Sequence, residues 1–336
     1  MNGGSPVEAT SDMLTIKLAN FRCVWNFVHE HGEVTIPQIS KGTGLSLPTV
    51  TKAVDFSLGE GIIRQLGLLG GERGRKAQTY CLSPDYAHFV FVFVSNGCLF
   101  FEIHNFVSDV LQSGTLYFES GAFLKTLDGL LNELVCNDKS IKMAGIAFPG
   151  SVLNGVVETS PLCPELLGID LRAHIEEKFS LACFIENAVN VAVSSSILGG
   201  QEEDEKISVA FLFSSHGCRA GILQNGELFK GANCFAGRLE NVLDLHGIYT
   251  EKHHAKLLRT VCALFDPSEV ILYSDSNEDT KKLKRLAFKD FEGQCIPRII
   301  EGRTLKKDVF IGLMVICKKV LLNPDHPGSV LGLDIK

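Results

Sequence analysis

The 336-residue sequence predicts an α/β fold with a small helical domain at the amino terminus and a larger body in two similar halves. Three patterns support this prediction. Residues 13–84 contain apolar residues at helical spacing and two helix starts that lie close together. From residue 85 onward, strand-like runs such as HFVFVFV alternate with amphipathic helices. The alternation begins a second time after the acidic stretch QEEDEK, which separates the two halves.

Within the amino-terminal domain, a helix over residues 16–31 precedes two shorter helices joined by a tight glycine turn. Thr35 caps the first short helix and Ser46 caps the second, and a proline follows in the first turn of each. On the second short helix, Val50 and Val54 face the core. This arrangement predicts a helix-turn-helix.

A β-hairpin follows, with the sequence IIRQLGLLGGERGRKAQTYCLS. Its tip carries three cations within four positions, Arg73, Arg75 and Lys76. A charged turn of this kind is also typical of an ordinary solvated loop. Directly after a helix-turn-helix, however, it predicts the wing of a winged helix, which holds phosphates or probes a minor groove of DNA.

The exposed start of the second short helix is the predicted recognition helix, the element that enters the major groove. Its hydroxyl and ammonium groups can contact bases or phosphates. Because one such domain makes few contacts, we expect two copies on a symmetric operator in double-stranded DNA, and hence a homodimer or larger homo-oligomer. The predicted DNA-binding residues are Ser46, Leu47, Thr49, Thr51, Lys52, Arg73, Arg75 and Lys76.

The chain resembles transcriptional regulators of the ROK family, named for repressors, open reading frames and sugar kinases, and in particular the xylose-repressor type. The resemblance is carried by AGIAFPGSV with GVVETSP, by FIENAVNVA and by AGILQNGELFKGANCFAG, and it extends from Lys17 to Leu322. It implies a two-lobed, actin-like body (ribonuclease H-like, sugar kinase type) behind the winged helix-turn-helix. The expected divisions are a disordered segment 1–12, the winged domain 13–84, the first lobe 85–195, the second lobe 196–308, and a carboxy-terminal helix and tail 309–336.

Comparison with the family's kinase residues implies a body without catalysis. The family's base is an Asp directly after an Asn, and Ala188 stands at that position and cannot take a proton. Phe93 or Val94 replaces the Asp of the first phosphate hairpin. In the second phosphate turn Arg219 stands where a bulky side chain obstructs the approach of backbone to phosphate. We therefore expect no catalytic residue and no cofactor.

Ligand binding is an open question at this stage. Glu186 and Asn187 end a strand, which is where α/β proteins place ligands. Asn187 either caps the next helix or contacts a polar ligand. In the family a Glu and a His hold sugar hydroxyls, whereas Arg238 and Asn241 stand at those positions and Leu162 replaces an Asn. The candidate ligand-binding residues are Gly150, Glu186, Asn187 and Arg238.

No metal site is expected. The family's Cys-rich zinc segment has no counterpart between Asn241 and Lys256. His246, His253 and His254 are expected to be ordinary surface side chains, because adjacent histidines on a helix point to different faces. The 11 cysteines include no C-x-x-C pair and predict free thiols.

Composition indicates a cytoplasmic protein without membrane contact. A hydrophobic content of 45% with 21% charged residues is typical of a globular protein. The amino terminus lacks the pattern of a signal peptide, and no apolar run is long enough to span a bilayer. Eight cations balance eight anions in residues 1–85, so the net charge of −7 belongs to the rest of the chain.

Together these features predict a DNA-binding transcription regulator, a repressor of carbohydrate-utilisation genes. Its inactive kinase-like body would support dimerisation and sense a sugar or sugar phosphate. One alternative is a divergent carbohydrate kinase, against which Phe93, Ala188 and Arg219 argue. The other is a ligand-independent DNA-binding protein with a decayed cleft, which the departures at the family's sugar positions favour.

Overall fold

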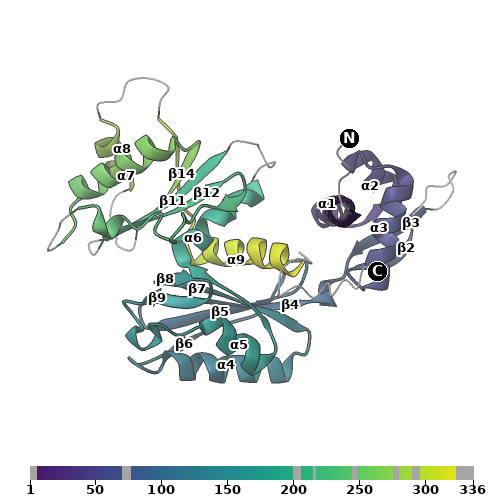
Figure 1. The fold of residues 1–336 in the computed structure, drawn as a ribbon, viewed down its shortest axis with the longest axis horizontal. Coiled ribbons are helices and arrows are strands. Elements are labelled where there is room, and N and C mark those ends of the chain that lie inside the picture. The colour runs from purple at the N-terminus through teal and green to yellow at the C-terminus, as the bar shows by residue number, and fades with distance from the viewer. Residues whose placement is uncertain are drawn as a thin grey trace. The chain divides into compact units, whose positions relative to one another are not determined.

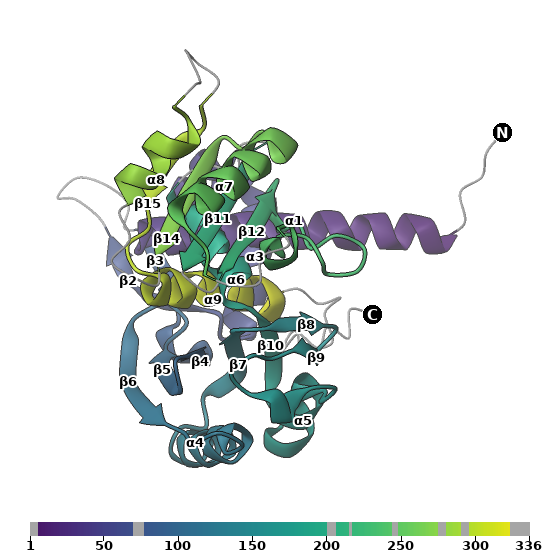
Figure 2. The same cartoon turned by 90° about the vertical axis from the view of Figure 1, so that its left-hand side faces the viewer.

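The computed structural model describes residues 6–69, 77–199, 206–214, 217–243, 248–274, 280–289 and 296–322. The chain divides into two compact units. The first comprises Met1–His88 and His104–Asp109, and the second, here called the body, comprises Phe89–Ile103 and Val110–Lys336. The elements of both are labelled in Figures 1 and 2.

The first unit combines helices with a three-stranded sheet in the order β1-β3-β2, in which both outer strands run antiparallel to β3. Its main elements are α1 (Pro6–His31), β1 (Val34–Thr35), α2 (Ile36–Thr43), α3 (Leu47–Gly59), β2 (Ile63–Leu69) and β3 (Ala77–Leu82). Residues 6–12, expected to be disordered, are part of α1. Pro6 fits the first turn because the backbone N–H that it lacks would have no partner there.

The predicted caps of the two short helices are confirmed. Thr35 caps α2 in a capping box, and Ser46 accepts a hydrogen bond from the third backbone N–H of α3. Between them Gly44 adopts a left-handed conformation, with φ of 72°, which ends α2 at little steric cost. Val50 and Val54 are fully buried, as expected.

A buried hydrogen bond fixes α3 against α1. The Trp25 indole N–H donates to Ser57 Oγ at 2.7 Å, and Ser57 in turn donates to the Ala53 carbonyl at 2.6 Å. The Phe21 ring stacks on Phe56, with 4.8 Å between ring centroids. These contacts orient α3 through its apolar face and leave the opposite face to solvent.

The body contains two five-stranded sheets. The first lobe has the strand order β10-β7-β4-β5-β6, and the second has β13-β12-β11-β14-β15. In the views of Figures 1 and 2, α4 and α5 lie on the face of the first sheet that is turned away from α9. Helices α7 and α8 lie beside the second sheet, and α6 and α9 lie between the two sheets.

The first-lobe elements are β4 (His88–Ser95), β5 (Cys98–His104), β6 (Val110–Tyr117), α4 (Phe123–Asn137), β7 (Ile141–Phe148), β8 (Ser151–Leu153), β9 (Val156–Thr159), α5 (Leu171–Phe179) and β10 (Ala182–Asn187). The following elements are α6 (Ala188–Val193), β11 (Ile207–Ser214), β12 (Gly217–Gln224), β13 (Glu227–Leu228), α7 (Glu251–Phe265), β14 (Glu269–Ser274), α8 (Thr280–Ala287), β15 (Arg298–Glu301) and α9 (Leu305–Leu321).

The two lobes begin alike, with a hairpin. The β4–β5 turn at Asn96 and Gly97 has positive φ at both residues, which matches the twist of a two-residue hairpin and confirms the predicted turn. β11 and β12 pair antiparallel in the second lobe. Strand β6 was not predicted, because most of its residues are exposed and its sequence VLQSGTLY lacks a clear apolar face.

Two glycines allow α6 to pack tightly at the centre of the body. A β-carbon at Gly312 of α9 would overlap the Val191 carbonyl oxygen, and one at Gly221 of β12 would overlap the Val189 carbonyl oxygen. Backbone therefore meets backbone on both sides of α6. This packing fixes the strand-to-helix corner at which α6 begins.

The predicted closing helix is α9, which begins four residues before the expected boundary at 309. Thr304 caps it by accepting a hydrogen bond from the Lys307 backbone N–H at 3.2 Å. One apolar side of the helix is buried within the body, and Val309 and Leu313 are buried completely. In the described part of the chain no helix, α9 included, has the length and hydropathy to cross a membrane.

We expect Gly312→Ala to lower the free energy of unfolding by about 1–3 kcal/mol, because the added methyl group forces α9 away from α6. Gly129→Ala is the matched control, since Gly129 lies within α4 with no atom close to an added β-carbon. There the better helix propensity of Ala should raise stability by about 0.5–1 kcal/mol. Urea unfolding measures both changes, and a stabilised Gly312→Ala variant would contradict the packing described.

Candidate functional site

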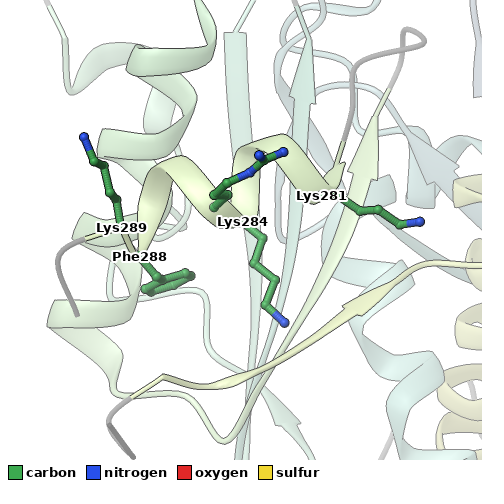
Figure 3. A pocket seen from close by; sticks show the side chains of 5 residues that line it. Lys281, Lys284, Phe288 and Lys289 are labelled. Atoms are coloured by element: carbon green, nitrogen blue, oxygen red, sulfur yellow. The ribbon is translucent and has the colours of Figure 1, made fainter. Parts of the chain in front are cut away.

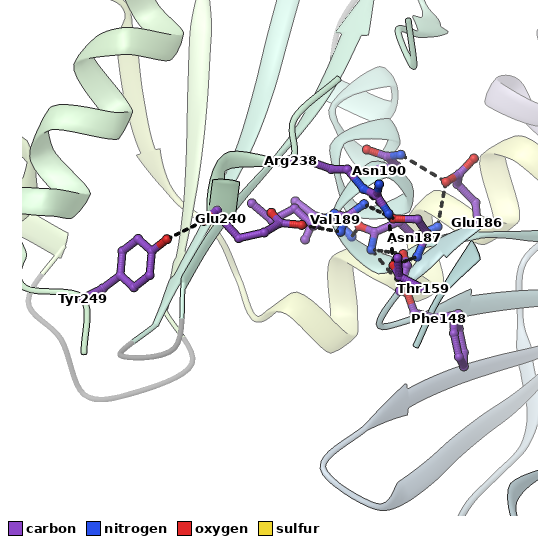
Figure 4. A network of polar contacts seen from close by, with 12 residues as sticks. Phe148, Thr159, Glu186, Asn187, Val189, Asn190, Arg238, Glu240 and Tyr249 are labelled. Atoms are coloured by element: carbon purple, nitrogen blue, oxygen red, sulfur yellow. Dashed lines mark hydrogen bonds and ion pairs between the residues drawn. The ribbon is translucent and has the colours of Figure 1, made fainter. Parts of the chain in front are cut away.

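The predicted corner at the end of β10 is buried and bonded internally (Figure 4). Asn187 caps α6, since its Oδ1 accepts from the Val189 N–H at 2.9 Å. Its Nδ2 donates to the Gly150 carbonyl at 2.7 Å. Glu186 Oε1 accepts from the Asn187 N–H at 2.8 Å and from Asn190 Nδ2 at 3.1 Å. The structure thus brings together Gly150, Glu186 and Asn187, with Asn187 acting as a helix cap.

Lys230 supplies the charge that balances Glu186. Lys230 Nζ lies 3.1 Å from Glu186 Oε2, and the carboxylate side chain is only 3% exposed. An unpaired carboxylate at this depth would be strongly destabilising. Because Lys230 follows β13 and Glu186 ends β10, this ion pair also joins the two lobes.

Two arginines of the second lobe lie side by side. Arg219 of β12 and Arg238 form an isolated antiparallel bridge, and directly opposed residues of such a pair present their side chains on one face. The neighbouring Ala220 N–H donates to the Gly237 carbonyl at 2.9 Å. Gly237 has φ of 81°, and an added β-carbon would overlap the Ala220 carbonyl oxygen. Glycine at 237 therefore allows the approach that places the two guanidinium groups together.

A pair of hydroxyl residues in the first lobe contacts these arginines. Ser151 and Thr159 are opposed in the β8–β9 ladder. Arg238 donates to Ser151 Oγ from both Nε, at 2.9 Å, and Nη2, and it also donates from Nη2 to Thr159 Oγ1 at 3.1 Å. Arg219 Nη2 donates to the same Ser151 Oγ at 3.1 Å. One serine hydroxyl thus accepts hydrogen bonds from two guanidinium groups across the lobes.

Positive charge exceeds negative charge in this network. Arg219 Nη1 lies 3.6 Å from Glu240 Oε1, which is an ion pair but too long for a hydrogen bond. Burial lowers the pKa of the Arg219 guanidinium and the nearby Arg238 lowers it further, against the opposing effect of the carboxylates. With the Lys230–Glu186 pair included, three cations face two carboxylates.

The positions that would carry kinase chemistry hold other groups. Ala188 begins α6 and is buried, and Phe93 is buried in β4 with its ring 6.0 Å from that of Phe100. Neither can accept a proton. Gly221, a glycine of the second phosphate turn, packs against α6 instead. The Arg219 guanidinium contacts Ser151 and Glu240.

Sequence reasoning missed Ser151, Thr159 and Lys230. The first two are polar residues within the family-like segments AGIAFPGSV and GVVETSP, which is a usable signal. Lys230 lies in the third family-like segment, AGILQNGELFKGANCFAG, but its pairing with Glu186 depends on a long-range contact that the sequence does not reveal. Leu162 is in an exposed loop, and the side chain of Asn241 lies outside the described residues.

The expectation that the histidines lie at the surface is wrong for His254. This side chain is fully buried on the inner face of α7, with Nε2 3.0 Å from the Ser214 carbonyl oxygen and its ring stacked on Tyr249. His253 accepts a hydrogen bond at Nδ1 from the Thr250 N–H, at 3.1 Å. His246 lies outside the described residues. Of the residues that are described, no three His, Cys, Asp or Glu side chains gather as a metal site would require.

On α3 the predicted DNA-binding residues differ in their availability. Leu47 and Lys52 are exposed, whereas Ser46 serves as the cap and shares a hydrogen bond of 2.8 Å with Thr49 Oγ1. Thr51 Oγ1 donates to the Leu47 carbonyl at 2.9 Å. The predicted wing residues that lie outside the described residues are Arg73, Arg75 and Lys76.

A separate depression of about 430 Å³ lies along α8 (Figure 3). Its lining consists of Lys281, Lys284, Arg285, Phe288 and Lys289. The labelled lysine side chains point away from one another rather than toward a shared centre. Because its donors do not converge, this basic surface is a weaker candidate for a specific small-molecule site than the Ser151 network.

The sequence matches one family model and several curated proteins. Residues 120–240 match the model of the ROK family. The chain contains a ROK family domain. Over 236 residues it is 26% identical to the xylose repressor of Caldicellulosiruptor bescii, a match that covers 67% of this chain and 58% of that protein. The chain spans about three fifths of the length of the curated relatives it matches.

Solved structures share the fold of this chain. The crystal structure of a ROK family transcriptional regulator, described as a homologue of the Escherichia coli MLC protein, superposes with a TM-score of 0.67 at 16% identity, covering 90% of this chain and 96% of that one. The ROK hexokinase of Thermus thermophilus superposes with a TM-score of 0.53 at 14% identity, covering 68% of this chain and 97% of that one. The body therefore has the expected actin-like, sugar kinase type of fold.

We expect Asn187→Ala to lower the free energy of unfolding more than Asp170→Ala does. Asp170 caps α5 by accepting from the Ala173 N–H at 2.9 Å, so its removal costs about 1 kcal/mol. Asn187→Ala removes a comparable cap and also leaves the Gly150 carbonyl without its amide donor, which adds about 1–3 kcal/mol. Urea unfolding of both variants measures the difference. Equal decreases in stability would show that the bond to Gly150 contributes nothing.

Proposed function

We propose that the chain is a DNA-binding transcription regulator, a repressor of carbohydrate-utilisation genes, that acts as a homodimer on double-stranded DNA. Its ROK body senses a small sugar-like ligand and does not transfer phosphate. The observation that carries the proposal is the order of elements in the first unit, in which α2, a glycine turn and α3 precede the β2–β3 hairpin. Three curated relatives of this chain are named xylose repressors, which supports the choice of genes.

The first unit has the features that a winged helix-turn-helix requires. Val50 and Val54 bury one face of α3, and the Trp25–Ser57 bond fixes its orientation. Lys52 lies on the opposite face and is exposed, and Leu47 is exposed at the start of the helix, the end that a recognition helix presents to the major groove. Strands β2 and β3 pair antiparallel and lead toward the cation-rich tip of the proposed wing.

At the end of β10 the described polar groups bond to one another, which supports a body that binds without catalysis. Ala188 occupies the position of the family's base, and Glu186 is tied to Lys230 and to backbone and amide donors. Both carboxylate oxygens of Glu186 therefore already have partners within the protein. These contacts support a sensor rather than the alternative of a divergent carbohydrate kinase.

Replacing Arg73, Arg75 and Lys76 by Ala should weaken binding to any DNA duplex, because the proposed wing binds phosphate. The slope of log affinity against log salt should fall by about 0.9 for each phosphate that the variant no longer neutralises. The matched control replaces Lys281 and Lys284 of α8 and Lys289, which follows it, by Ala, which removes three cations from the body. Fluorescence anisotropy across a salt titration measures both, and a wing variant that binds like the control would refute the proposed wing.

The purified protein should show no sugar-dependent ATP hydrolysis, with glucose or xylose as the sugar and a sugar kinase as the positive control. Ala188→Asp should not restore activity, because Arg219 and Phe93 still occupy the phosphate-binding positions. Coupled ADP release measures the reaction. Sugar-dependent turnover by the unmodified protein would overturn the proposal that the body is inactive.

A further inference from the structure

We propose that Arg219 and Arg238 form an anion site in the body, and that the ligand sensed there is a sugar derivative bearing a carboxylate or phosphoryl group. The inference rests on the proposed sensing function and specifies the chemical class of its ligand. It assigns to Arg238 the recognition of an anion rather than of a neutral sugar hydroxyl.

The donors around Ser151 exceed what its hydroxyl can accept. Three guanidinium N–H groups approach Ser151 Oγ, two from Arg238 and one from Arg219. A hydroxyl oxygen has two lone pairs, and it carries no full negative charge to offset two neighbouring cations. A carboxylate or phosphoryl group offers two or three charged oxygens, which planar guanidinium groups bind in pairs.

The local carboxylates leave this positive charge uncompensated. Glu186 is held by Lys230, and Glu240 lies 3.6 Å from Arg219, beyond hydrogen-bond distance. In the part of the chain that the structure describes, the polar partners of Arg238 are hydroxyl groups. An entering anion would add the negative charge that balances the network.

The arginine pair meets solvent on the side of Arg238, since the Arg219 side chain is only 18% exposed. Arg238 is half-buried, and Thr159, which it contacts, is exposed. The ring of Phe235 is exposed beside Arg238, with its centroid 5.5 Å from the guanidinium carbon. Phe235 offers an apolar surface to the carbon face of a sugar ring, which favours an anionic sugar over a bare inorganic ion.

The first step of the test uses the smallest probes of each anion class. Inorganic phosphate and acetate are added to the full chain at constant ionic strength, and the unfolding midpoint and calorimetric affinity are measured. The second step compares glucose with glucuronate and glucose 6-phosphate, which share a ring and differ in charge. We expect phosphate or acetate to bind, the corresponding anionic sugar to bind more tightly, and glucose to have no effect.

Arginine variants locate the binding. Arg238→Gln and Arg219→Gln should each weaken anion binding by at least about tenfold, as removal of one charge-assisted hydrogen bond predicts. Arg238→Lys retains the charge without the planar fork and should weaken binding to an intermediate degree. Arg298→Gln, an exposed arginine on β15, is the control and should bind like the unmodified protein. No binding by any anion, or binding unchanged in Arg238→Gln, would overturn the inference.

Two further outcomes separate this inference from its alternatives. If Arg238→Gln lowers the unfolding midpoint while no anion shifts that of the unmodified protein, the arginines only join the lobes and the inference fails. DNA binding is measured in parallel. Anion binding without DNA binding would overturn the proposed regulator and leave the anion site standing, whereas DNA binding without anion binding would overturn the anion site alone.

Discussion

Two guanidinium groups of the second lobe converge on one serine hydroxyl of the first, and the arrangement of the polar residues between the lobes depends on that contact. Arg219 lies in β12 and Arg238 lies in a later loop that meets β12 through one isolated antiparallel bridge, while Ser151 stands opposite Thr159 in a separate two-strand ladder. Each partner is therefore fixed by backbone pairing before the side chains meet. Because like charges repel, the pair is stable only while acceptors hold it, and Ser151 is the acceptor that both share.

The corner at the start of α6 is satisfied by its own neighbours. Asn187 caps the helix and bonds Gly150, and Glu186 is neutralised by Lys230. Glycines at 221 and 312 let α6 lie directly against strand and helix backbone. A catalytic corner needs groups that are free to react, whereas the side chains of Glu186 and Asn187 are held by hydrogen bonds and an ion pair. The body thus combines the fold of a sugar kinase with a corner whose polar groups bond to one another.

Much of the fold could be predicted from local sequence signals. The caps at Thr35 and Ser46, the Asn96–Gly97 turn and the buried strands all follow from short-range chemistry, and the structure has them where expected. The candidate site was predicted only in part. Glu186 and Asn187 end a strand and were recognisable, but the convergence of Arg219 with Arg238 depends on a single long-range bridge that no periodicity reveals. The burial of His254 was missed for the same reason, since it depends on which face of α7 meets the sheet.

A footprint of the full chain on DNA tests most directly whether the protein is a dimeric DNA-binding regulator. Duplexes retained from a genomic library are sequenced, and the protected bases of the tightest are mapped at physiological salt. A dimer with one recognition helix per copy should protect two half-sites related by two-fold symmetry. Their centres should be separated by a whole number of helical turns. Retention of no duplex above background, or uniform protection without repeated half-sites, would contradict this prediction.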